Sequence, residues 1–145
     1  MVEEMGGIMD GLYYHGLGYL PLVLTKDWQL AQLNYAPAQD PDALTLFDQH
    51  TFTDETFTLL QGRSLLITYD EASENMEITP LEPLVTYNVP EMMWHNIAME
   101  PGSVVLITEG RDAHLKGCNH IPIPQSCREQ IIAAAQRLWG TAQDT

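Results

Sequence analysis

The chain has 145 residues, 45% of them hydrophobic, and carries 20 acidic against six basic side chains, a formal net charge of −14. This length fits one domain with a sizeable core. The charge disfavours nucleic acid and anionic membrane surfaces as partners, because phosphate binding takes clustered lysines and arginines. Here the basic residues are scattered: Lys26, Arg63, Arg111, Lys116, Arg128 and Arg137.

Targeting and redox features of the sequence favour the cytoplasm. No apolar run approaches the roughly 20 residues that span a bilayer, and the first residues include Glu3 and Glu4 where a secretion signal is basic. Cys118 and Cys127 make no disulfide framework. We therefore expect a cytoplasmic protein with two free thiols.

The predicted elements are mostly strands. Residues 1–19 are glycine-rich and are predicted to be an irregular or partly helical lead-in. Short apolar or alternating segments separated by turn residues follow, which is the pattern of an all-β sandwich or barrel. We assign the barrel to residues 20–125, with strands at 20–25, 28–35, 44–50, 55–61, 63–69, 76–79, 85–89, 94–99 and 104–109.

The chain is predicted to end in a loop followed by a helix. His114, Cys118 and His120 loosely resemble a ligand spacing, but they follow the last predicted strand, and we interpret their segment as a covering loop. Ser126 followed by Glu129 is a capping-box pattern. It opens a predicted helix at 126–140, with an apolar stripe and a stop at a terminal glycine: Ile131, Ile132, Ala135, Leu138, Trp139 and Gly140.

Imidazole and carboxylate groups gather at the edges of two predicted strands. His50 and Glu55 flank a four-residue loop, and His95 begins a later strand. If those strand ends meet, two imidazoles and a carboxylate form a set with open positions, as in non-haem iron and catalytic zinc sites. Asp48 has the strand parity of His50 and can add an oxygen ligand. The predicted cofactor is a divalent transition metal: Zn, Fe, Ni or Mn.

The first of these segments resembles the first motif of the cupins. That motif has two histidines one residue apart, a glutamate four or five positions on, and a glycine after six more. His50, Glu55 and Gly62 stand at the second histidine, the glutamate and the glycine. Asp48 replaces the first histidine.

The second segment resembles the second cupin motif. Pro90 and His95 match its proline and histidine, whereas Met92 stands at the glycine and Met99 at the asparagine. The resemblance covers residues 44–109 and is nearest to small uncharacterised bacterial cupins and to those linked to surface-sugar biosynthesis. It implies an all-β fold, the double-stranded β-helix or jelly-roll barrel. It also implies a homodimer, because cupins commonly pair and the apolar helix face needs cover on the barrel or on a partner subunit.

Three classes of function follow. The first is a metal-dependent enzyme on a small polar metabolite. The second is a metal-free isomerase or epimerase like the sugar-nucleotide cupins, in which His50 with Asp48 moves a proton and Tyr69 returns one. The third is a non-catalytic module that binds a small molecule. We favour the first, because the second needs a cationic pocket. The predicted pocket residues are Phe57, Tyr69, Met93 and Arg111.

Overall fold

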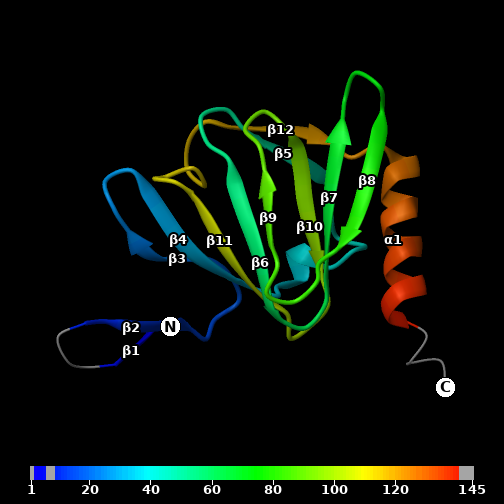
Figure 1. Cartoon of the computed structure of the whole chain (residues 1–145). Helices are drawn as coiled ribbons and strands as arrows, with labels where there is room; N and C mark the ends of the chain where they lie inside the picture. The colour runs from blue at the N-terminus through cyan, green and yellow to red at the C-terminus, as the bar shows by residue number, and fades with distance from the viewer. Residues whose placement is uncertain (1, 6–8, 141–145) are drawn as a thin grey trace.

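A computed structural model describes residues 2–5 and 9–140, and within them two antiparallel five-stranded sheets face each other (Figure 1). Sheet I runs in the order β12 (Cys118–Pro122), β5 (Leu46–His50), β10 (Trp94–Met99), β7 (Ser64–Asp70) and β8 (Asn75–Pro80). Sheet II runs in the order β3 (Gly18–Leu24), β4 (Trp28–Asn34), β11 (Val104–Gly110), β6 (Glu55–Gln61) and β9 (Thr86–Val89). The predicted jelly-roll barrel is confirmed.

The barrel core forms because each strand sends alternate side chains inward. Leu66, Ile97 and Met99 of sheet I meet Phe57 and Ile107 of sheet II in one buried cluster. Between β4 and β5, η1 (Pro37–Gln39) is a short 3₁₀ turn. At the barrel end where β6 begins, several buried side chains are polar: His50, Glu55, His95 and Glu109.

Helix α1 (Gln125–Trp139) packs on the outer face of sheet I (Figure 1). Ile131, Ala135 and Trp139 are buried in one cluster with Leu65 and Ile67 of β7. The apolar face that suggested a partner subunit is thus covered within the chain, and the homodimer stays a prediction. No helix in the described part of the chain has the length and apolar character to cross a membrane.

The ends of α1 test the predicted caps. Gly140 is the C-cap, as expected, whereas the capping box is wrong. The N-cap is Pro124, which has no side chain to offer, and Ser126 already lies inside the helix. The helix therefore begins at Gln125, and no N-cap side chain bonds its first N–H groups.

Two segments predicted to be irregular are strands. Near the N-terminus, β1 (Val2–Met5) and β2 (Gly11–Tyr14) form a hairpin. The buried Gln32 side chain holds it by bonding the backbone N–H and C=O of Tyr14, at 3.1 and 2.9 Å. The predicted covering loop contains β12, which pairs with the edge of β5. In β12 only Ile121 packs on the apolar cluster under α1, so no apolar alternation marked this segment as a strand.

Both motif glycine positions require a left-handed backbone. Gly62 has φ +81°, and a Cβ there would lie 2.6 Å from Ser103 Cα. Met92, which replaces the glycine of the second motif, has φ 71°. Its N–H donates to the carbonyl oxygen of His50 at 2.7 Å, so this strained turn anchors β10 beside β5.

We expect Gly62→Ala to be clearly more destabilising than Gly102→Ala, its matched control. Gly102 has φ +88° but open space around it, so its substitution adds only the backbone strain, about 1–2 kcal/mol. At Gly62 the contact with Ser103 adds roughly another 1–3 kcal/mol. Urea unfolding of both variants measures the difference, and equal losses would show that the Ser103 contact is easily relieved.

Candidate metal centre

Strand register brings two rows of polar side chains face to face inside the barrel. In sheet II, Glu109 of β11 pairs with Glu55 of β6. In sheet I, Asp48 of β5 pairs with His95 of β10. Both rows line one cavity of about 220 Å³. The cavity therefore has Glu55 and Glu109 on the sheet II wall, and the imidazoles of His50 and His95 with the carboxylate of Asp48 on the sheet I wall.

Three buried side chains converge on one point of this cavity. Glu55 Oε1 lies 2.9 Å from His50 Nε2 and 2.8 Å from His95 Nε2. The three residues are only 7%, 6% and 4% exposed, for His50, Glu55 and His95 in turn. One ligand atom from each lies within 4.8 Å of the others, and the imidazole nitrogens come from sheet I while the carboxylate comes from sheet II.

The His95 ring is held in the orientation that a metal ligand needs. Its Nδ1 lies 3.0 Å from the carbonyl oxygen of Met93, which can only accept, so Nδ1 carries the proton. In a neutral ring this leaves the Nε2 lone pair aimed at Glu55 Oε1. A lone pair facing a carboxylate requires either a proton or a cation between them, and a backbone carbonyl on the far nitrogen is the usual support of a metal-bound histidine.

Hydrogen bonds between the two motif loops bring these strand ends together. Asp54, directly before Glu55, accepts from the backbone N–H of Glu91 at 2.9 Å and from Asn88 Nδ2 at 3.1 Å. These bonds lower the pKa of Asp54. The loop of the first motif is thereby tied to the loop of the second, which explains how local sequence patterns far apart in the chain form one site.

Glu109 is a carboxyl group of this site that sequence reasoning did not select. Its Oε1 lies 3.4 Å from His50 Nε2 and has no hydrogen-bond partner among the described residues. Its Oε2 accepts from the Tyr19 hydroxyl, and Gln29 Nε2 donates to that hydroxyl at 2.8 Å. The available signal was strand parity: Glu109 sits at the end of a strand that was predicted correctly.

Burial and charge move the pKa values of the two carboxyl groups apart. Burial raises the pKa of Glu55, but the hydrogen bonds with His50 and His95 outweigh it and bring the value to about 2. For Glu109, burial and the neighbouring Glu55 charge raise the pKa to about 7. Burial lowers the pKa of both histidines, yet bonding to Glu55 leaves them raised. Glu55 is thus an anion, and Glu109 holds a proton up to neutral pH.

Of the four predicted ligands, the structure brings together His50, Glu55 and His95. Asp48 lies outside that group, although it lines the same cavity. Its Oδ1 is 2.7 Å from His120 Nδ1, across the pairing of β5 with β12. The motif position of Asp48 therefore did not predict its contact, which is with His120 and not with the other three residues.

Of the four predicted pocket residues, only Phe57 lines this cavity, edge-on to the His95 ring with centroids 5.9 Å apart. Tyr69 is elsewhere because its strand parity points it outward, where it stacks on Phe47 at 4.7 Å. Met93 borders a separate hollow beside Tyr69. Arg111 is not in the cavity lining; its Nε donates to Asp112 at 3.2 Å and its Nη1 to the Thr25 carbonyl at 2.9 Å.

The three converging groups fit a divalent transition metal. Two imidazole nitrogens and a carboxylate oxygen are ligands that Fe(II), Mn(II), Ni(II) and Zn(II) accept. The unpartnered Oε1 of Glu109 beside them is a further sign, because a buried polar atom is normally satisfied. As ligands, these three groups would leave coordination positions open on a metal of this class.

Comparison with known proteins supports the fold. No protein-family model and no curated protein matches the sequence. Among solved structures, a cupin-2 domain protein from Shewanella frigidimarina is 16% identical, with a TM-score of 0.51 over 68% of this chain and 85% of that one. The Fe(II) form of HppE is 18% identical, with a TM-score of 0.50 over 75% of this chain. The match spans only 56% of the HppE chain. The protein is therefore a small cupin-fold domain.

In the metal-free protein we expect the free energy of unfolding to fall as pH rises from about 5 to about 8. Glu109 keeps its proton in the fold up to a pKa of about 7 but ionises near 4.5 when unfolded, so the native state binds more protons in this window. Ionisation of Glu109 should lower the free energy of unfolding by roughly 2–3 kcal/mol across this pH window. The raised histidine pKa values act in the same direction, whereas the lowered pKa of Glu55 matters only at more acidic pH.

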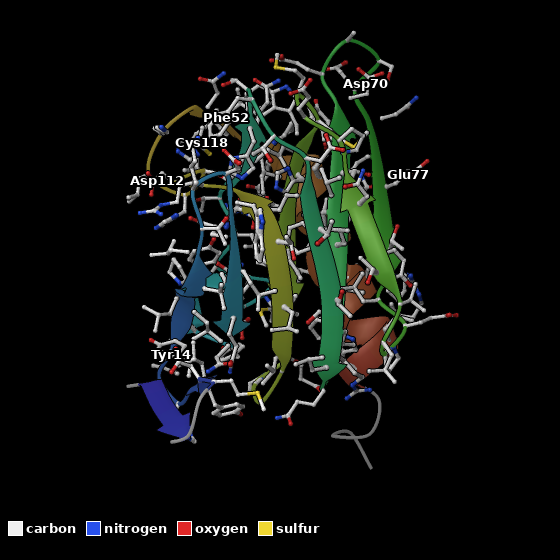
Figure 2. All side chains as sticks on the ribbon, turned by 60° about the vertical axis from the view of Figure 1, so that its left-hand side comes forward. Tyr14, Phe52, Asp70, Glu77, Asp112 and Cys118 are labelled. Atoms are coloured by element: carbon white, nitrogen blue, oxygen red, sulfur yellow. The ribbon has the colours of Figure 1, made fainter. Side chains whose placement is uncertain are left out.

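Glu109→Gln should remove much of this pH dependence, measured by denaturant unfolding in the presence of a chelator. The control Glu77→Gln changes an exposed carboxylate on β8, at the far edge of the barrel in Figure 2, and should leave the profile as it is. A Glu109→Gln profile as steep as that of the parent would contradict the assignment.

Proposed function

We propose that this protein holds a divalent transition metal through His50, Glu55 and His95 and acts as a metal-dependent enzyme on a small polar molecule. The observation that carries the proposal is the buried convergence of two Nε2 atoms on one carboxylate oxygen, at 2.8 and 2.9 Å. Burying two imidazole nitrogens against one carboxylate oxygen is unfavourable unless a proton or a cation lies between them. A bound ion would supply Lewis-acid or oxygen-activating chemistry at the open positions.

The chain itself supplies a proton carrier beside the ion. In the metal-free protein the pKa of Glu109 is raised to about 7. Its Oε1 lies 3.4 Å from His50 Nε2 and has no hydrogen-bond partner among the described residues, so it is placed to accept a proton beside the proposed ion. Tyr19 and Gln29 fix its other oxygen, so the carboxyl group cannot rotate away. Phe57 and Ile107 form part of the apolar wall that limits water near these groups.

The metal-free isomerase is less well supported. A sugar nucleotide is anionic, and no lysine or arginine is found among the described residues that line the cavity. Tyr69, the expected proton donor of that reading, lies against Phe47 on the outer face of sheet I. Tyr19 would have to replace it, and its hydroxyl is already engaged with Glu109.

Elemental analysis of protein purified without chelator or metal-affinity tag tests the proposal. We expect Glu55→Gln to lower the content of transition metal by about one equivalent, because the substitution keeps the shape but removes the anionic ligand. Glu77→Gln, which makes the same chemical change on the exposed strand β8, should not alter it.

Two outcomes would count against the proposal. Unchanged metal content in Glu55→Gln would remove Glu55 as a ligand. A parent protein that stays free of metal after incubation with Fe(II), Ni(II), Mn(II) and Zn(II) would leave the non-catalytic binding module as the better reading.

A further inference from the structure

A second group of ligand-type side chains lines the same cavity on the neighbouring strand pair. β12 pairs with β5 so that His120 is opposite Asp48 and Cys118 is opposite His50. Cys118 and His120 are two residues apart and share a face of β12, as Asp48 and His50 do on β5. Directly opposite residues in an antiparallel pair have Cβ atoms about 4.5–5.5 Å apart. The register alone therefore gathers a thiol, an imidazole and a carboxylate.

The side chains of these three residues do lie close together. Asp48 Oδ1 lies 2.7 Å from His120 Nδ1, and one ligand atom each from Asp48, Cys118 and His120 lies within 4.8 Å of the others. Ligands on one tetrahedral ion with bonds of about 2.0–2.3 Å are separated by about 3.3–3.8 Å. The three atoms thus need only small rotations to share an ion. In Figure 2, Cys118 lies on the side of the barrel where Phe52 and Asp112 are also found.

The charge of the cavity accommodates more than one cation. Its described lining contains three carboxyl groups and one thiol, from Asp48, Glu55, Glu109 and Cys118, and no lysine or arginine. If cation binding displaces the protons of Glu109 and Cys118, the four groups carry four negative charges, which two divalent ions balance. A single ion at His50, Glu55 and His95 would leave Asp48 uncompensated except by His120.

We propose that Asp48, Cys118 and His120 form a second metal site, separate from the first, that takes a borderline-soft divalent cation such as Zn²⁺. The mixed thiolate, imidazole and carboxylate set matches the preferences of Zn²⁺ and Co²⁺ and is too soft for Mg²⁺ or Ca²⁺. Half-exposure of His120 and Asp48 gives the ion access from solvent. Binding releases the Cys118 thiol proton to water. The site does not depend on the first centre being occupied.

Titration of the metal-free, reduced protein with Co²⁺ tests the site, because thiolate-to-cobalt charge transfer gives a near-ultraviolet absorption that nitrogen and oxygen ligands do not. We expect this band to appear and saturate at one equivalent of thiolate-bound Co²⁺. Cys118→Ser should abolish it, and the control Cys127→Ala should keep it, because Cys127 lies on the buried face of α1, packed on the outer face of sheet I. Asp48→Asn should raise the Kd of the band at least about tenfold with Cys118 intact.

Glu55→Gln separates this site from the first centre. It should reduce total bound Co²⁺ by about one equivalent and leave the thiolate band unchanged. A band lost in Glu55→Gln, with one equivalent bound in all, would mean that Cys118 joins the first ion, and would overturn the second site. No band in the parent, or a band that survives Cys118→Ser, would overturn it as well. Circular dichroism of each variant checks that the fold is retained.

Discussion

The site depends on one buried interaction, the contact of the Glu55 carboxylate with two imidazole nitrogens. Glu55 comes from β6 of sheet II, whereas His50 and His95 come from β5 and β10 of sheet I. A buried carboxylate without such partners would be strongly unfavourable. The contact therefore stabilises the charge and also joins the two sheets at the end of the barrel that the apolar core does not fill.

A second carboxyl group, that of Glu109, adds charge repulsion at this end of the barrel. Glu109 is directly opposite Glu55 in the ladder, where two like charges destabilise a sheet. Three features reduce this repulsion. The pKa of Glu109 is raised, the Tyr19 hydroxyl donates a hydrogen bond to Glu109 Oε2, and Glu109 Oε1 lies 3.4 Å from His50 Nε2. Either a proton or a cation would relieve this repulsion, so the titration of Glu109 and the proposed metal binding would be linked through this pair of carboxyl groups.

Strand β5 connects this centre to the neighbouring group of ligands. Its two inward residues serve different neighbours: His50 contacts Glu55, and Asp48 contacts His120. Asp48 stands at the motif's first histidine position in the sequence, but its side chain contacts His120 and not Glu55. β12 places this imidazole and the Cys118 thiol on the side of β5 away from β10.

The sequence by itself predicted the barrel, nine of the ten strands in its two five-stranded sheets, and the trio of His50, Glu55 and His95, because these depend on local information: alternation, turn residues and motif spacing. It could not reveal β12, the contacts of Asp48, or Glu109 as part of the site. Only the tertiary structure decided those, since each depends on which strand lies beside which and in what register. Parity says which side chains share a face, but neighbours on that face come from distant parts of the chain.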